Sequence, residues 1–247
     1  MDEKNILLSG VSDLFGLCEK RGSSVFSCFY DAAEQAEINR ARVLYGECGF
    51  WGGHEECERK ILGVFPEWEE TVFSCYPIRA IRISHTYSRE LSHRDYLGSI
   101  MGLGVERNRI GDIFVFEKYA VCFVHESISE YLLGGISKIG SVGVKVCDIT
   151  GEEIKPPVKK TRQISAVCAS ERLDAVLSAM TGESRSKVSS LISHERVSIN
   201  HEIVCDLSKK TAEGDLISVK GYGRFLICSF GSKTRSNRIH IEAQKFI

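Results

Sequence analysis

Residues 172–200 read RLDAVLSAMTGESRSKVSSLISHERVSIN, and this stretch decides how the carboxyl-terminal part of the chain folds. Apolar residues recur at helical spacing over 172–180 and again over 184–194, with Thr181-Gly182-Glu183 interrupting the pattern. The side chains expected to face inward are Leu173, Val176, Leu177, Met180, Val188, Leu191 and Ile192. Two short amphipathic helices are therefore predicted, the second beginning at Ser184.

The segments that follow these helices have the pattern of strands. The expected strands are 196–200 and 203–205, on either side of a tight turn at Asn200-His201, and 216–219, which follows Gly214-Asp215. We therefore predict a small α+β domain over residues 163–247. Residues 153–162 are predicted to be a linker, because this part of the chain is polar and charged and contains Pro156-Pro157.

The part of the chain before the linker divides into two blocks. Residues 1–75 are predicted to be mainly helical, with helices at 5–20, 31–44 and 54–62. Residues 76–152 are predicted to follow the order β-α-β-β-α-β, which is typical of ferredoxin-like and RNA-recognition (RRM) folds. The expected strands are 78–84, 113–116, 121–124 and 141–149, and the expected helices are 92–101 and 127–138. The predicted fold class is α+β.

Charge is distributed unevenly along the chain, although the net charge is only −1. Residues 155–247 hold 16 Lys/Arg and 9 Asp/Glu, a net charge of +7, whereas residues 1–154 hold 16 and 24, a net charge of −8. A basic end on an acidic body is typical of a nucleic-acid-binding module. The chain shows neither a membrane-length apolar run nor a secretory signal pattern, so we expect a cytoplasmic protein without a membrane partner.

Ten cysteines raise the question of disulfides or a metal site. They are scattered along the chain, and no two form the closely spaced pair of a zinc knuckle. Several, such as Cys122, lie inside apolar segments, so buried reduced thiols are expected. We predict no metal, no cofactor, no catalytic residue and no small-molecule substrate.

The start of the second carboxyl-terminal helix is the main candidate binding site. A helix beginning at Ser184 presents free backbone N–H groups, which favour a phosphate. Arg185 and Lys187 lie in its first turn, where basic side chains oppose the helix dipole, so helix stability alone does not explain them. Arg172 is expected to join this patch, with Asp174 holding Arg172 or a backbone amide. The candidate RNA-binding residues are Arg172, Ser184, Arg185, Lys187, Arg196, Asn200, Lys209, Lys210, Lys220 and Arg224.

This region resembles the S-four RNA-binding domain, a small module named after a ribosomal small-subunit protein. The matching residues are Arg172-Leu173-Asp174, Leu177, Ser184-Arg185-Ser186-Lys187-Val188, Leu191-Ile192, Val197-Ser198-Ile199-Asn200, Gly214-Asp215 and Ile217. The sequence departs from the family where Glu195 and His201 stand in place of glycine. Both positions are expected to shape the backbone, so the departures bear on turn geometry rather than on RNA binding.

The whole chain is similar to the YlmH family of bacterial proteins. The matching stretches are 93–104 (HRDYLGSIMGLG), 109–113 (RIGDI), Gly52-Gly53 with 55–60 (EECERK), and 221–225 (GYGRF). The resemblance implies an RNA-recognition-like middle domain followed by the S-four domain. It also implies association with ribosomal RNA on the large subunit beside transfer RNA, in the rescue of stalled translation, and a link to cell division.

Two other features invite a functional interpretation. Phe114, Phe116 and Phe123 alternate along the predicted strands of the middle domain as stacking residues would, but the usual RNA-recognition signature is absent, so core packing is expected. The run His93-Arg94-Asp95-Tyr96 superficially resembles a catalytic cluster. At a helix start it is expected to cap the helix and brace the Gly102–Gly104 loop.

Two alternatives to a non-enzymatic RNA-binding protein remain open from the sequence. An RNA-modifying enzyme is one, because S-four domains are often attached to pseudouridine synthases and methyltransferases. However, Arg172-Leu173-Asp174 lies in the S-four helix rather than in a catalytic domain, and Gly102-Leu103-Gly104 follows a helix rather than a strand. The other is an interaction scaffold in cell division, which predicts that Arg185 and Lys187 tolerate charge reversal.

Overall fold

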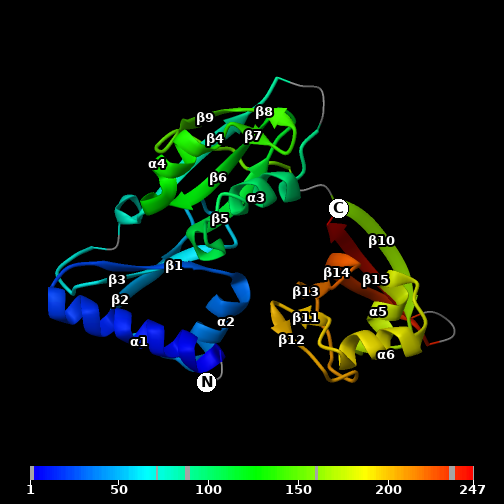
Figure 1. Ribbon diagram of the computed structural model, residues 1–247. Helices are drawn as coiled ribbons and strands as arrows, with labels where there is room; N and C mark the ends of the chain where they lie inside the picture. Colours follow the sequence, from blue (N-terminus) through cyan, green and yellow to red (C-terminus); the bar gives the residue numbers. More distant parts are fainter. Residues whose placement is uncertain (1–2, 71, 87–89, 159–160, 234–236, 247) are drawn as a thin grey trace. The chain divides into compact units, whose positions relative to one another are not determined.

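The computed structural model describes residues 3–70, 72–86, 90–158, 161–233 and 237–246. The chain forms two compact units, Met1–Pro157 and Val158–Ile247, which are treated separately below (Figure 1). The break between them lies within the predicted linker, of which residues 159–160 are outside the described residues. In the described part of the chain, no helix has both the length and the apolar character needed to cross a membrane.

The amino-terminal part of the first unit is built from two helices and a three-stranded sheet. Its helices are α1 (Glu3–Arg21) and α2 (Ala32–Ala41), and its strands are β1 (Val25–Tyr30), β2 (Glu47–Trp51) and β3 (Lys60–Phe65). The sheet is antiparallel in the order β1-β3-β2. Apolar side chains of α1 and α2, including Phe15 and Ile38, pack with Leu62 and Val64 of β3. The two helices therefore cover one face of the sheet.

The predicted helices at 5–20 and 31–44 are present as α1 and α2, but the third predicted helix is not, and the three strands were not predicted. The expected helix at 54–62 is instead a turn followed by β3. Strand β3 is central in its sheet, and its residues 61–65 are buried against apolar clusters on both faces. A short apolar run of this kind has no alternating pattern, so periodicity does not distinguish it from a buried helix.

The second part of the first unit has the predicted element order. It comprises β4 (Ile78–Ser84), α3 (His93–Met101), β5 (Ile110–Val115), β6 (Tyr119–His125), α4 (Glu126–Gly135) and β9 (Lys145–Asp148). The four strands form an antiparallel sheet in the order β5-β6-β4-β9. The predicted last strand, 141–149, is divided, because 142–143 instead form β8 (Val142–Gly143), which pairs with β7 (Lys138–Ile139). The capping box of Ser92 and Asp95 is present at the start of α3, as predicted.

The two parts of this unit meet where the chain around Gly52-Gly53 lies against the four-stranded sheet. Gly53 has a φ of +93°, and a Cβ atom there would lie 2.5 Å from Cδ1 of Phe123. The ring of His54 makes an edge contact with Phe114, with 5.5 Å between the ring centroids. Phe114 and Phe123 are consequently buried, which confirms core packing as their role.

Asp112 holds the same junction through hydrogen bonds. Its carboxylate oxygen Oδ2 accepts from the backbone N–H groups of Glu58 and Arg59, which precede β3. The Arg59 side chain donates from Nε to the carbonyl of Ile110, at 3.0 Å, and from Nη2 to the carbonyl of Phe29, at 3.1 Å. Burial raises the pKa of the Asp112 carboxyl above its ordinary value. Residues of the 109–113 (RIGDI) stretch and of the 55–60 (EECERK) stretch therefore meet here as structural partners.

The second unit is one six-stranded antiparallel sheet with two helices. The strand order is β10-β15-β14-β13-β11-β12. Its elements are β10 (Thr161–Cys168), α5 (Leu173–Thr181), α6 (Arg185–Ser193), β11 (Val197–Ile199), β12 (Glu202–Ile203), β13 (Leu216–Val219), β14 (Gly223–Lys233) and β15 (Ile239–Phe246). The two predicted helices and the strands at 197–199 and 216–219 are present. Strands β10, β14 and β15 were not predicted.

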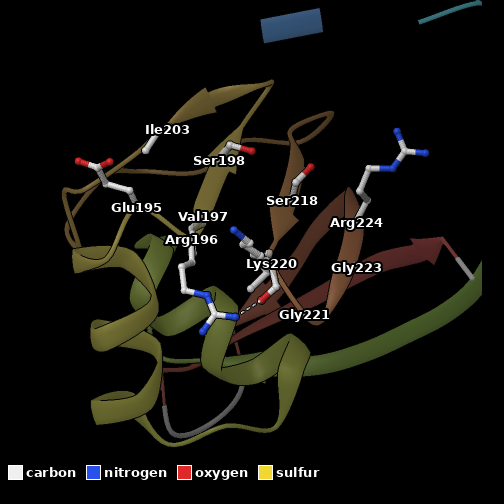
Figure 2. A pocket seen from close by; sticks show the side chains of 11 residues that line it. Glu195, Arg196, Val197, Ser198, Ile203, Ser218, Lys220, Gly221, Gly223 and Arg224 are labelled. Carbon is white, nitrogen blue, oxygen red and sulfur yellow. Dashed lines mark hydrogen bonds between the residues drawn. The ribbon is translucent and has the colours of Figure 1, made fainter. Parts of the chain in front are cut away.

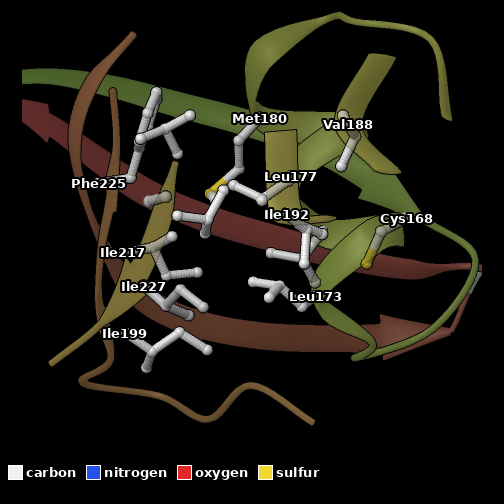
Figure 3. Close-up of a cluster of buried hydrophobic side chains, with 14 of the residues drawn as sticks. Cys168, Leu173, Leu177, Met180, Val188, Ile192, Ile199, Ile217, Phe225 and Ile227 are labelled. Atoms are coloured by element: carbon white, nitrogen blue, oxygen red, sulfur yellow. The ribbon is translucent and has the colours of Figure 1, made fainter. Parts of the chain in front are cut away.

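The core of the second unit lies between the two helices and one face of this sheet. All seven inward-facing side chains predicted from residues 172–194 are buried in it. Figure 3 shows five of them, Leu173, Leu177, Met180, Val188 and Ile192, against Ile199, Ile217, Phe225 and Ile227 from the strands. Because side chains alternate along a strand, the neighbours of these apolar residues, such as Ser198, Ser218 and Arg224, point to the opposite face.

Candidate nucleic-acid interface

The start of α6 combines a capping serine with exposed basic side chains. The Ser184 hydroxyl oxygen accepts a hydrogen bond from the backbone N–H of Lys187, at 3.3 Å, and so caps the helix. Arg185 and Lys187 are exposed, whereas Val188 on the next turn is completely buried. The first N–H groups of a helix have no partner within the helix and carry a partial positive charge. This end of α6 therefore presents two cations and backbone donors to the same solvent region.

Arg172 lies at the start of α5 with Lys209 and Lys210, rather than at the start of α6. Its guanidinium pairs with the Asp174 carboxylate through Nε–Oδ1, at 3.1 Å, and Nη2–Oδ2, at 3.3 Å. Asp174 Oδ1 also accepts from the backbone N–H of Ala175, so the predicted structural role of Asp174 is confirmed. A β-bridge joins Arg172 to Lys210, and the N–H of Leu173 donates to the carbonyl of Lys209. Because α5 is about 13 Å long, this group is separated from the start of α6.

A third group of predicted residues lines a hollow of about 360 Å³ (Figure 2). Arg196, Lys220 and Arg224 contribute their basic side chains to it, and Ser198 and Ser218 contribute hydroxyl groups. Arg196 Nη2 donates to the carbonyl of Lys220 at 3.1 Å, which fixes its side chain along the turn between β13 and β14. The register aligns Ser198, Ser218 and Arg224 across three strands on the face away from the helices. The predicted RNA-binding residues thus occupy both faces of the sheet.

Asn200 is bound within the protein. Its amide nitrogen Nδ2 donates to Oδ1 of Asp215 at 2.8 Å, and its Oδ1 accepts from the backbone N–H of Leu216 at 2.9 Å. These bonds tie the turn after β11 to the start of β13. A role in RNA binding for Asn200 therefore has support from the sequence resemblance alone.

Two family models match the chain. The one described as "Putative RNA-binding domain in YlmH" matches residues 75–153, and the S4 (S-four) domain model matches residues 171–217. The "Ribosome-associated protein quality control protein P2" of Bacillus subtilis (strain 168) is 29% identical over 199 residues, which are 79% of this chain and 77% of that protein. The chain is thus similar to YlmH proteins in its middle part and contains an S4 domain. The resemblances stated from the sequence, to YlmH proteins and to the S-four domain, are confirmed.

A solved structure of a YlmH protein has a similar fold. The "Cell division protein ylmH from Streptococcus pneumoniae" matches with a TM-score of 0.51 over 60% of this chain and 92% of that one. The sequence identity is 22%, so the similarity concerns the fold alone.

Residues 93–96, part of a YlmH-like stretch, make contacts that hold the helix start and the core. The Asp95 carboxylate accepts from the backbone N–H of Ser92 at 2.8 Å, as part of the capping box. Tyr96 is completely buried, and its hydroxyl has no hydrogen-bond partner in the described part of the chain. Burial raises the pKa of Tyr96 to about 12, so the phenol stays neutral. A tyrosine in this position does not reach a substrate at the surface.

The ten cysteines are all free, and they divide by environment. Cys18, Cys57, Cys122 and Cys168 are buried, whereas Cys75, Cys147, Cys205 and Cys228 are exposed. The expectation of buried thiols therefore holds for four of the ten and is wrong for the four exposed ones. Among the described residues, no three His, Cys, Asp or Glu side chains are grouped as a metal site.

The two positions where this chain lacks the glycine of the S-four family have left-handed backbones. Glu195 has a φ of 56° and His201 a φ of 70°, next to Asn200 at 49°. A side chain with a Cβ atom is strained by about 1 kcal/mol or more in this conformation. We expect His201→Gly to raise the free energy of unfolding of the second unit by about 0.5 to 1 kcal/mol, because asparagine followed by glycine suits such a turn.

Urea denaturation of the full-length chain measures this effect. His201→Ala serves as the matched control, because it removes the imidazole and keeps the strained Cβ atom. Equal stabilisation by both substitutions would show that the imidazole, and not the backbone, is the source of the strain.

Proposed function

We propose that this protein binds structured ribosomal RNA on the large ribosomal subunit, beside transfer RNA, and acts in the rescue of stalled translation without catalysing a reaction. The name of the Bacillus subtilis relative, a ribosome-associated quality control protein, supports the ribosomal setting. The two matched domains support RNA as the partner. Residues 155–247 carry a net charge of +7, which supports binding to a polyanion.

The observation that carries the proposal is the start of α6. Ser184 satisfies one helix N–H, while Arg185 and Lys187 extend into solvent beside the remaining donors. Two cations in the first turn oppose the helix dipole, so their benefit lies in a bound anion rather than in the helix. A phosphate at this position receives backbone hydrogen bonds and two charges together. Since each phosphate contact releases counterions, binding is expected to weaken steeply as salt increases.

A binding role fits the geometry better than a catalytic one. Asp174, the aspartate of the Arg-Leu-Asp string, is engaged by Arg172 and by the backbone N–H of Ala175 on a short helix. The glycines at 102–104 follow α3 and close it, with Gly102 at the helix end, so they do not form a cofactor loop between a strand and a helix. These contacts favour a protein that positions RNA over one that modifies it.

The experiment is sedimentation of the full-length protein with separated large and small ribosomal subunits, and with protein-free large-subunit RNA. We expect the protein to travel with the large subunit and with its naked RNA, and to be displaced as KCl is raised from about 50 to 200 mM. Binding to the intact subunit but not to its RNA would assign the contact to a ribosomal protein. Binding to neither would overturn the proposal and favour the cell-division scaffold.

A further inference from the structure

A second hollow in the carboxyl-terminal unit is lined mostly by residues outside those that the S-four model matches, with Met180 and Thr181 as the exceptions. Its volume is about 400 Å³, and it opens where α5 ends over strands β10 and β15. The residues that concern its chemistry are Arg162, Lys245, Tyr222, Phe225, Met180 and Thr181. Two of them, Arg162 and Lys245, are cations, and they lie on strands β10 and β15, which were not predicted from the sequence.

The strand register places these two cations side by side on the face that otherwise forms the core. Arg162 of β10 pairs with Lys245 of β15, and Lys245 pairs in turn with Phe225 of β14. The residues that follow on the same face are apolar: Ile164, Ala166 and Cys168 on β10, and Ala243, Ile241 and Ile239 on β15. The apolar face of the sheet therefore ends in a pair of positive charges beyond the end of α5.

Within the described part of the chain, no carboxylate neutralises this pair. Neither Arg162 nor Lys245 makes an ion pair there, and the contact of the Lys245 ammonium is with the ring of Phe225, 5.5 Å from its centroid. The Glu183 carboxylate accepts from the Tyr222 hydroxyl at 2.8 Å, and Glu242 pairs with Ser165 on the opposite face of the sheet. Like charges directly across a strand pair destabilise a sheet. A bound anion would remove this repulsion.

Residues 180–184 link the hollow to the start of α6. Its lining residues Met180 and Thr181 end α5, and Glu183 stands immediately before the capping residue Ser184. Tyr222 of the hollow is hydrogen-bonded to Glu183, and the Ser178 hydroxyl donates to the Glu183 carbonyl at 2.7 Å. These hydrogen bonds hold the segment between α5 and α6, which connects the Arg162–Lys245 pair to the start of α6.

We propose that this hollow binds a backbone phosphate of the RNA whose neighbouring phosphates lie at the start of α6. Arg162 and Lys245 supply the charge, and the exposed side of Tyr222 faces the adjoining sugar or base. The inference rests on the proposed function and extends it, because it adds β10 and β15 to the RNA-binding surface of the domain.

The test compares the full-length wild type with Arg162→Gln/Lys245→Gln in binding to purified large ribosomal subunits over a range of KCl concentrations. The control, Lys20→Gln/Arg21→Gln, removes the same charge from exposed positions of the first unit that lie outside both matched domains. We expect the Arg162/Lys245 variant to bind about ten-fold more weakly, with a log–log salt dependence shallower by about 0.7 to 0.9, because each phosphate contact contributes about this much. Its melting temperature should equal or exceed that of the wild type, since the substitution removes a repulsion.

The outcomes separate this inference from the proposed function. If the wild type does not bind the subunit, the proposed function is overturned, and the inference that rests on it falls with it. If the wild type binds and the Arg162/Lys245 variant matches it in affinity and salt dependence, the inference is overturned while the function stands. If, in addition, inorganic phosphate at constant ionic strength raises the melting temperature of the wild type and not of this variant, the hollow binds free phosphate instead of RNA. Equal weakening by the control variant would assign the effect to overall charge and also overturn the inference.

Discussion

Replacing Arg185 and Lys187 together by glutamate should weaken binding to the large ribosomal subunit by about a hundred-fold or more. Each substitution removes a charge-assisted hydrogen bond to phosphate, worth about 1.5 to 3 kcal/mol, and adds a repulsive charge. Both side chains are exposed and lie in the first turn of α6. The measurement is the dissociation constant from sedimentation at fixed salt, together with the slope of its salt dependence.

The same substitution is expected to leave α6 folded, which makes the result interpretable. Glutamate in the first turn of a helix interacts favourably with the helix dipole, so the melting temperature should stay the same or rise. The matched control is Lys20→Glu/Arg21→Glu, which changes the net charge equally at exposed positions of the first unit outside both matched domains. Undiminished binding by the Arg185/Lys187 variant would remove the α6 start from the interface. A loss of binding by both variants would indicate long-range charge instead of a local contact.

Asp112→Ala should lower the stability of the first unit by about 2 to 4 kcal/mol. The substitution removes the acceptor of the Glu58 and Arg59 backbone N–H groups, the first exposed and the second part-buried, and a hydrogen bond to a charged group contributes about 1.5 to 3 kcal/mol. It also releases the chain around Gly52-Gly53 from the sheet that carries Phe123. Urea denaturation of the full-length chain should show an earlier transition for the first unit and an unchanged one for the second.

Asp112→Asn provides the control, because its amide oxygen can still accept these hydrogen bonds. Since burial raises the pKa of Asp112, the folded state binds the proton more tightly than the unfolded state does. The contribution of this carboxyl to stability therefore falls as the pH rises from the unfolded pKa to the folded pKa, and asparagine removes this dependence. A loss from Asp112→Asn as large as that from alanine would show that the negative charge, rather than the acceptor, holds the junction.

The sequence alone predicted helices and helix starts correctly where a local apolar pattern and a specific motif coincide. The apolar spacing of residues 172–194 predicted both helices of the second unit and their buried side chains, and the capping pair Ser92 and Asp95 predicted the start of α3. Local chemistry also identified the start of α6, because Ser184, Arg185 and Lys187 lie within one helical turn. These features depend on neighbours in the chain, so the order of residues contains the information that specifies them.

Contacts between residues far apart in the sequence decided which strands form and which basic side chains lie together. Strand β3 is buried on both faces only because β1, β2 and the helices surround it, and its sequence pattern does not indicate this. Pairing between β10 and β15 brings Arg162 opposite Lys245, although 83 positions separate them in the sequence. Arg172 was expected beside Arg185 but lies with Lys210, because a β-bridge joins them at the far end of α5. Sequence determined which residues form each helix and cap, whereas strand register, which depends on long-range hydrogen bonds, decided which basic side chains share a surface.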